Sequence, residues 1–282
     1  MGILDLTLSV LAVLLWANWQ MEVSASQKKR VTDLGHVGRT ISHNAEPASS
    51  WKTMLLLMAI LFLRPFIYWQ IGMGIDWNAM LKFGAVSIPF RSDNLLHMTL
   101  FSLAGFIQLL LIFYSWILFL GLMKYGDNVN EKNLLHKSIH VFTGPILKWP
   151  VVFRVLLPGL ITIPLWIIFC LILEKANIFP VQTFKSIFCE SLVMGLCAYL
   201  PWCHLMALLI FIYILNSYFY LTSSPIWNYL HSFTHRILTP LYFLKLQIYK
   251  IDFTPVAGMA IVFLIYENGT KALSVLFTYA LR

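Results

Sequence analysis

Two charged residues inside otherwise apolar stretches are the strongest candidates for chemistry in this chain. Arg64 lies 12 residues after Lys52, and Glu267 lies 12 residues after Pro255. A charge inside lipid is costly and needs a partner. Both stretches are expected to enter the bilayer from the same side, and a helix rises about 1.5 Å per residue, so the two charges reach a similar depth. We therefore predict an interhelical ion pair between Arg64 and Glu267, with separate snorkelling to the outer surface as the alternative.

Histidines and cysteines offer weaker candidates. His231 and His235 have the i, i+4 spacing that can direct two imidazoles to one metal, but no HExxH motif is present, so solvent exposure is favoured. His204 lies among Pro201, Trp202 and Cys203, a setting typical of a packed histidine rather than a haem ligand. The cysteines form no CxxC pair and lie in or beside apolar stretches, so we interpret them as small buried apolar residues: Cys170, Cys189, Cys197 and Cys203.

Motifs of known catalytic chemistry are absent from the sequence. There is no GxSxG nucleophile motif, no Walker loop, no Rossmann glycine set and no CxxCH haem-attachment motif. We predict no catalytic, cofactor-binding or metal-binding residues, and therefore a protein that is not an enzyme.

The elements that must position these residues are long apolar segments. Hydrophobic residues make up 59% of the chain and charged residues only 11%. A spanning helix needs roughly 20 apolar residues, and lipid forces backbone groups to bond internally. We predict an all-α membrane protein with about six spanning helices: Ile3–Gln20, Thr53–Gly72, Leu95–Leu122, Val152–Leu173, Cys189–Leu221 and Pro255–Leu276. The first segment lacks a basic leader and a small-residue cleavage site, so an uncleaved anchor is favoured over a signal peptide.

The net charge of +8 is best explained by membrane topology. Placing both termini outside gives the inner connections about twice as many lysines and arginines as the outer ones, as the positive-inside rule requires. This excludes any need for a nucleic-acid partner. We expect a multi-pass protein of the bacterial inner membrane with its basic connections in the cytoplasm.

The chain divides into an N-terminal region and two tandem units. Residues 1–72 form an anchor region with a polar cytoplasmic loop over 21–51, and the apolar connection 73–94 is expected to lie in the membrane interface. Units 90–173 and 184–282 are predicted to be parallel repeats, each a span, an amphipathic interfacial connection and a proline-started span. Three correspondences support the repeat: Phe90-Arg91-Ser92 with Phe184-Lys185-Ser186, His136 and Pro145 with His231 and Pro240, and Leu157-Pro158 with Thr254-Pro255.

The connection from Ser224 to Asp252 has the clearest local pattern. A helix starting at Ser224-Pro225 has apolar residues every three or four positions and should end or kink at Pro240. The alternation after it predicts an extended piece, which we expect to pair with a similar piece within residues 146–157. Thr254 and Pro255 then suit the start of the last span, with Asp252 near its positive dipole end. A pure helix-start role for this Asp is favoured over ligand or partner binding.

These residues resemble the signature of the YggT family of small bacterial membrane proteins, which has plastid relatives. The matching positions are Ser224, Pro225, Thr234, Pro240, Asp252, Thr254 and Pro255, and the resemblance covers about Phe184–Leu276. The first unit has Leu156-Leu157-Pro158 in place of the acidic turn. The resemblance implies roles in osmotic tolerance, envelope or division-site organisation, or cofactor attachment to membrane cytochromes, and it implies no reaction.

A scaffold or assembly factor for membrane complexes is the leading functional prediction. Its expected partners are the lipid bilayer and other membrane proteins or further copies of itself, and no cofactor is expected. A small-solute or ion transporter linked to osmotic tolerance is the alternative, because the proline-interrupted spans are typical of transport sites. An intramembrane enzyme using His204 or Glu267 ranks last.

Overall fold

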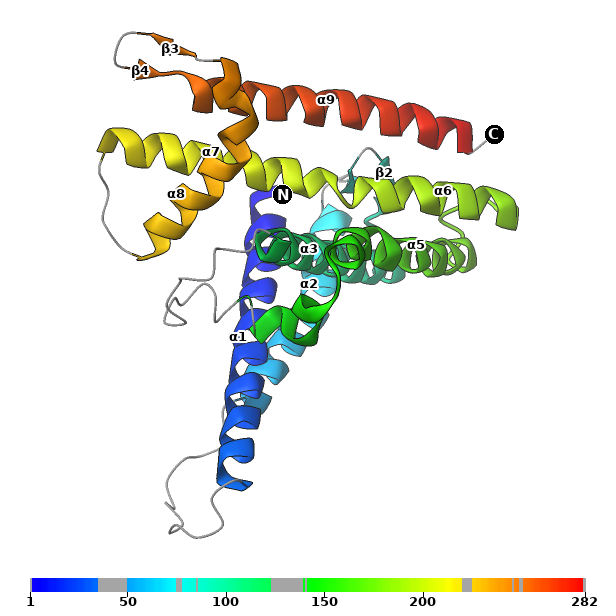
Figure 1. Cartoon of the computed structure of the whole chain (residues 1–282). Coiled ribbons are helices and arrows are strands. Elements are labelled where there is room, and N and C mark those ends of the chain that lie inside the picture. The colour runs from blue at the N-terminus through cyan, green and yellow to red at the C-terminus, as the bar shows by residue number, and fades with distance from the viewer. Residues whose placement is uncertain are drawn as a thin grey trace. The chain divides into compact units, whose positions relative to one another are not determined.

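The structure is a computed structural model of the whole chain, and it describes residues 2–34, 50–74, 78–84, 86–122, 139, 141–219, 225–244, 246–248 and 251–280 (Figure 1). The chain forms two compact units. Unit 1 comprises Met1–Leu81 and Ser87–Leu110, and unit 2 comprises Lys82–Val86 and Leu111–Arg282.

Unit 1 is built on two antiparallel helices, α1 (Gly2–Leu34) and α2 (Ser50–Gly74), and on the first part of α3 (Leu95–Leu122). Ala12, Leu57 and Phe106 form their common core. Helix α1 continues well beyond the predicted span, so the start of the predicted polar loop 21–51 is helical instead. Residues 35–49 lie outside the described part of the chain.

A β-hairpin follows α2, where the sequence predicted an interfacial segment over 73–94. Its strands are β1 (Asn78–Phe83) and β2 (Val86–Arg91). Side chains of β2 alternate strictly, with Val86, Ile88 and Phe90 buried and the residues between them exposed. A period of two matches a strand with one buried face, which explains why this segment is extended rather than helical.

The described residues of unit 2 hold the end of α3 and five further long or amphipathic helices. Helix α5 (Val151–Lys175) is followed by α6 (Phe184–Cys197) and α7 (Leu200–Phe219), which are separated by a short turn. The amphipathic α8 (Pro225–Leu238) leads through the 3-10 helix η2 (Thr239–Leu244) to α9 (Thr254–Ala280). A second 3-10 helix, η1 (Gly144–Lys148), precedes α5.

Small residues permit close packing between α5 and α6. A Cβ added to Gly195 would lie 2.8 Å from Ile163 Cγ1, and a Cβ added to Gly159 would lie 3.2 Å from the Gly195 carbonyl oxygen. Such small-residue contacts let membrane helices approach closely enough for dispersion to hold them together. Helices α7 and α9 run side by side in the same unit (Figure 1).

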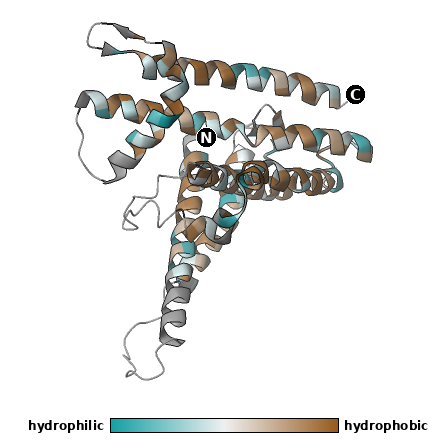
Figure 2. Cartoon of the chain, in the orientation of Figure 1, coloured by the Kyte–Doolittle hydropathy of each residue, from teal (hydrophilic) through white to brown (hydrophobic). Residues whose placement is uncertain are grey.

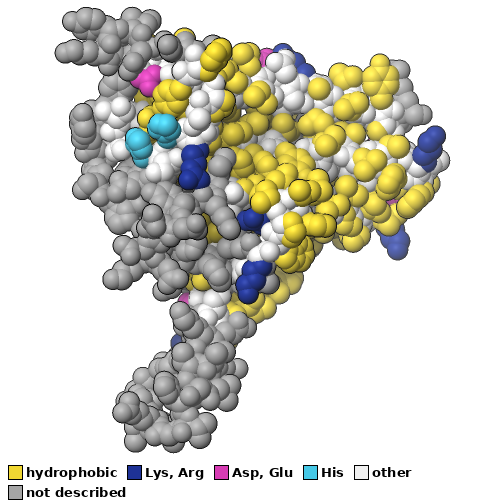
Figure 3. Space-filling view, in the orientation of Figure 1, with side chains coloured by type: hydrophobic (Ala, Val, Ile, Leu, Met, Phe, Trp, Pro, Cys, Tyr) yellow, Lys and Arg dark blue, Asp and Glu magenta, His cyan; other side chains and the backbone are white. Residues whose placement is uncertain are grey.

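Six helical segments of the described chain are long and apolar enough to cross a membrane: Asp5–Ser24, Trp51–Gly74, Leu95–Leu122, Val151–Lys175, Phe184–Ser217 and Thr254–Ala280. Hydrophobic residues follow these helices along their length (Figure 2), and hydrophobic side chains cover much of the face seen in Figure 3. Large apolar side chains such as Phe62, Leu160 and Leu264 remain more than half exposed. The predicted all-α membrane fold class is confirmed, because lipid is the medium that suits so much apolar surface.

The prolines of the predicted repeat have partly matching settings. Pro145 and Pro240 each occupy the second residue of a 3-10 helix, η1 and η2. However, Pro158 lies inside α5, whose N-cap is Pro150, whereas Pro255 is the second residue of α9. The predicted correspondence of Pro158 with Pro255 is therefore wrong in structural terms, and the repeat itself stays a prediction.

The extended piece after Pro240 also has a different partner from the one predicted. Strand β3 (Gln247–Ile248) pairs antiparallel with its own neighbour β4 (Ile251–Asp252). The region over 146–157 forms η1 and the start of α5 instead of a strand. A neighbouring segment is favoured because closing a short loop costs little entropy.

Candidate functional site

A buried polar cluster joins α1 and α2 within unit 1. The Arg64 side chain is only 1% exposed and forms a salt bridge with Asp5. Its Nη2 also donates to Ser9 Oγ over 2.7 Å, and its Nε donates to Tyr68 Oη over 2.8 Å. The Tyr68 hydroxyl in turn donates to Asp5 Oδ1 over 2.6 Å. The two helices thus contribute one carboxylate, one guanidinium and two hydroxyl groups to a closed network of hydrogen bonds.

Local spacing explains why these four residues meet. Asp5 and Ser9 are four residues apart on α1, and Arg64 and Tyr68 are four apart on α2, so each pair occupies one helix face. The guanidinium lies 5.4 Å from the Tyr68 ring centroid, which adds a cation–π contribution. Within the described residues Arg64 Nη1 alone of this guanidinium has no hydrogen-bond partner. The cluster neutralises the buried charge of Arg64 and ties α1 to α2.

The structure assigns Arg64 and Glu267 different partners from the predicted ones. Arg64 bonds Asp5 in unit 1, whereas Glu267 bonds Lys271 over 2.7 Å, one turn further along α9. Both members of the α9 pair are exposed. The predicted Arg64–Glu267 pair is therefore wrong, because it relied only on the depth of the two residues in the membrane. Arg64 bonds a residue of the helix that packs against α2, and Glu267 bonds the residue four positions further along its own helix.

A clasp of two indoles surrounds the break between α6 and α7. Trp116 Nε1 of α3 donates to the Pro201 carbonyl over 2.8 Å, and Trp202 Nε1 of α7 donates back to Ser115, over 2.6 Å to Oγ and 3.1 Å to the carbonyl. Ser115 Oγ also lies 3.4 Å from the Ala198 carbonyl oxygen. A proline cannot donate to the helix ladder, so a break near it leaves carbonyls that need other partners. The clasp gives one such carbonyl, that of Ala198 at the C-cap of α6, a donor from Ser115 inside a membrane-spanning segment.

The residues predicted to match a family signature lie on α8, in η2 and at the start of α9. Thr234 is fully buried and its hydroxyl lies 3.4 Å from the Leu209 carbonyl of α7. Asp252 Oδ1 accepts the Thr254 amide over 2.9 Å, and α9 begins at Thr254 with Pro255 second. This geometry is that of a helix-start device. Pro225 opens α8 and Pro240 lies in η2, while Ser224 is outside the described residues.

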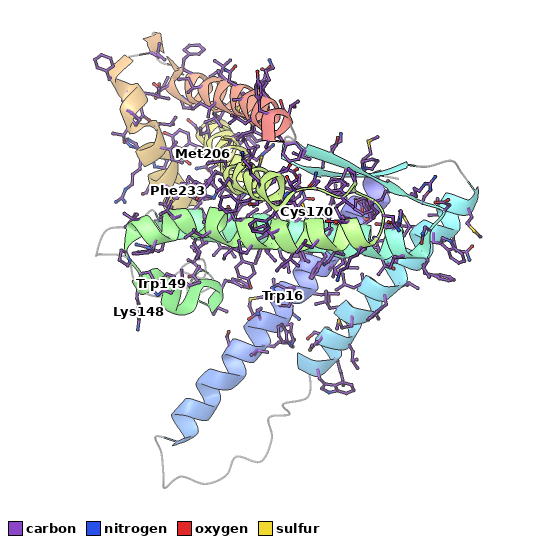
Figure 4. All side chains as sticks on the ribbon, turned by 90° about the vertical axis from the view of Figure 1, so that its right-hand side faces the viewer. Trp16, Lys148, Trp149, Cys170, Met206 and Phe233 are labelled. Atoms are coloured by element: carbon purple, nitrogen blue, oxygen red, sulfur yellow. The ribbon has the colours of Figure 1, made fainter. Side chains whose placement is uncertain are left out.

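The two faces of α8 have different surroundings. Phe233 and Leu238 are buried against α7 and α9, and Figure 4 shows Phe233 near Met206 of α7. His231, His235 and Arg236 are exposed on the other face. The predicted amphipathic helix is present, and its place at a membrane interface stays a prediction.

The histidines on that exposed face lie beside aromatic rings of α7 and η2, within the same unit. The rings of Tyr213 and His231 are 5.0 Å apart, as are those of His235 and Tyr242. Burial, the hydrogen bond to Tyr213 and the nearby Asp252 carboxylate together raise the pKa of Tyr242 above its ordinary value. His204 of α7 packs edge-on against Tyr266, with ring centroids 4.4 Å apart. No group of three metal-ligating side chains occurs among the described residues, and the four cysteines are free thiols.

Two acidic residues escaped the sequence analysis. Asp5 lies near the start of the first span, and Glu190 is completely buried in α6. The signal that could have found them is i, i+4 spacing to a hydroxyl residue, Ser9 for the first acid and Ser186 for the second. No protein-family model, no curated protein and no solved structure matches this chain.

Proposed function

We propose that this chain is a non-enzymatic, multi-pass scaffold or assembly factor of YggT type in the bacterial inner membrane. In this proposal the exposed face of α8 binds other membrane proteins on the cytoplasmic side. The observation that carries it is the contrast between the faces of α8: one is fixed against the spans, and the other presents His231, His235 and Arg236 to its surroundings.

The fixed face makes α8 a firm platform. Phe233 packs on Phe119 with ring centroids 5.8 Å apart, and Leu238 is fully buried with Ile210 and Val262. A helix held by buried contacts from two neighbouring helices loses little further freedom when a partner binds, so more of the contact energy appears as affinity.

The exposed face defines the chemistry of the partner. Arg236 is permanently cationic. Figure 3 shows His and Lys or Arg side chains close together on this side of unit 2. Electrostatic complementarity favours a membrane protein with an acidic segment close to the bilayer surface.

Purification from native membranes tests the proposal. A photo-crosslinker at position 235 should capture the same membrane protein reproducibly, and Arg236→Glu should reduce its recovery at least fivefold at low salt. Lys185→Glu is the matched control, because Lys185 is another exposed cation and lies at the far end of α6. Equal recovery from both variants, or capture of no membrane protein, would contradict the proposal. Capture of a second copy of this chain would show self-association instead, and would contradict the acidic partner.

A transporter is the second candidate, favoured by the helix break within one membrane-spanning segment. Broken helices serve transport when their freed carbonyls bind the solute or ion. Here the Ala198 carbonyl at the break already lies 3.4 Å from the Ser115 hydroxyl. Solute flux from the pure protein in liposomes would favour transport over scaffolding.

A further inference from the structure

Glu190 is the most deeply buried acid among the described residues of unit 2. Its side chain has no exposed surface, and it lies on α6, where this helix packs against α5 and α9. Its carboxyl oxygen Oε1 lies 3.3 Å from Ser186 Oγ, and its Oε2 has no hydrogen-bond partner among the described residues. Gln182 and the Trp166 indole lie beside the same carboxyl, although the indole nitrogen completes no hydrogen bond within the described residues.

The hydrogen bonds open to Ser186 are limited by its single proton, and this limit bears on the protonation state of the Glu190 carboxyl. Ser186 Oγ also lies 3.0 Å from the Ala280 carbonyl oxygen at the end of α9. A serine hydroxyl has one proton, and a carbonyl oxygen can only accept. Ser186 can therefore donate to only one of these two oxygens, and that of Ala280 is the nearer. When Ser186 donates to Ala280, its contact with Glu190 is a hydrogen bond only if the carboxyl donates.

The charges around Glu190 favour the same state. The titratable side chain found against it is the Cys170 thiol of α5, whose position Figure 4 shows; this group offers no positive charge. Helix α9 contributes the Ala280 carbonyl, and the C-terminal end of a helix carries partial negative charge. Lys82 of the hairpin and Lys185 of α6 are exposed, and neither of the two salt bridges found among the described residues includes Glu190. An unpaired carboxylate in such surroundings is far more costly than a neutral acid.

We propose that Glu190 is an intramembrane proton-binding site, occupied at neutral pH, whose proton links α6 to the end of α9. The neutral carboxyl donates to Ser186, and Ser186 donates to the Ala280 carbonyl, which lies at a helix end where carbonyls need partners. Loss of the proton would turn the Ser186 hydroxyl toward the carboxylate and leave the Ala280 carbonyl without its donor. Proton binding at this site therefore controls the contact between α6 and α9. The inference does not depend on the proposed scaffold role.

Infrared difference spectroscopy tests the proposal on the full chain in lipid. A protonated carboxylic acid has a carbonyl stretching band above the amide bands, and a carboxylate does not. At pH 7 the wild-type spectrum minus that of Glu190→Gln should contain this band, and exchange into D2O should shift it. Glu267→Gln is the matched control, because Glu267 is exposed and paired with Lys271, and this variant should keep the band. Absence of the band from the Glu190→Gln difference spectrum would overturn the proposal.

Two further measurements keep the test decisive if Glu190→Gln folds poorly. Ser186→Ala should keep the acid band but move it to higher frequency, because the carboxyl loses its hydrogen-bond acceptor. An unchanged acid region would contradict the proposal, since Glu190 would then be ionised or would form no hydrogen bond with Ser186. Wild-type thermal stability should also fall as the pH is raised from 6 to 9, relative to Ser186→Ala, because only the wild type loses the link to α9. Parallel pH profiles would contradict the proposed control of the α6–α9 contact.

Discussion

Removing the Asp5 carboxylate tests whether Arg64 depends on its counter-charge within the α1–α2 pair. The Arg64 side chain is 1% exposed and that of Asp5 33% exposed, so Asp5→Ala leaves a buried guanidinium without an anion. Breaking a buried ion pair by removing one partner costs about 3–5 kcal/mol. The partial exposure of Asp5 places the expected loss at the lower end, about 3 kcal/mol, or roughly a hundredfold in the unfolding equilibrium.

Reversible unfolding in detergent micelles measures this loss, and a double-mutant cycle isolates its cause. Adding Arg64→Met to Asp5→Ala removes both charges, so most of the stability should return; with Arg64→Met alone as the fourth corner, the cycle should give a coupling energy of about 2 kcal/mol. Glu22→Gln is the matched control: it removes an acid that bonds Thr53 across the same two helices over 3.2 Å, and it should cost less than about 1 kcal/mol. If Asp5→Ala proves no worse than Glu22→Gln, the reasoning about a buried, counter-charged Arg64 is refuted.

Three further outcomes follow from the packing and titration of unit 2. Trp202→Phe keeps an aromatic ring but loses the indole donor to Ser115, so unfolding in micelles should become easier by about 1–2 kcal/mol. Gly258→Ala places a Cβ 2.5 Å from Leu238 Cδ2, and because Leu238 is fully buried the overpacking should cost about 1–3 kcal/mol in the same assay. The pKa of Tyr242 is raised above 10, so the unfolded state loses this proton first and stability falls as the pH rises beyond that value; alkaline thermal melts of Tyr242→Phe should show a shallower fall.

Each of these outcomes has a matched comparison. Trp51→Phe changes an indole that is 57% exposed and should leave stability nearly unchanged. Gly74→Ala adds a Cβ with no atom within 4 Å and should be neutral or slightly stabilising. For the titration, identical alkaline profiles of the wild type and Tyr242→Phe would show that this phenol does not link pH to folding.

Predictions from local patterns were confirmed where the ends of a helix depend only on residues close to them in the sequence. Leu95–Leu122 was predicted residue by residue, and α8 lies between Pro225 and Leu238 as its prolines and apolar spacing required. The hairpin around Gly84 was missed, although Val86–Arg91 alternates with a period of two. The apolar residues of the connection were interpreted as those of a segment lying in the membrane interface. Only the structure shows that one face of strand β2 is buried, which identifies the connection as a hairpin.

The candidate sites were harder to predict. The residues of the Asp252-to-Pro255 turn lie at the helix start that their types indicated, because capping is decided within a few residues. The partner of Arg64 was predicted wrongly, and Glu190 was overlooked. The partner of Arg64 and the burial of Glu190 both depend on which side of a helix faces a neighbouring helix. The composition of a segment shows only that the helix as a whole is apolar.

What the sequence by itself determined is the medium and the spans, because lipid leaves an apolar chain no alternative to bonding its own backbone. What only the tertiary structure decided is the pairing of polar groups: Arg64 with Asp5, and Ser186 with both Glu190 and the Ala280 carbonyl. These pairings follow from the rotation and register of helices against one another. Rotation and register are settled by the packing of whole helix faces, and no short stretch of residues contains that information.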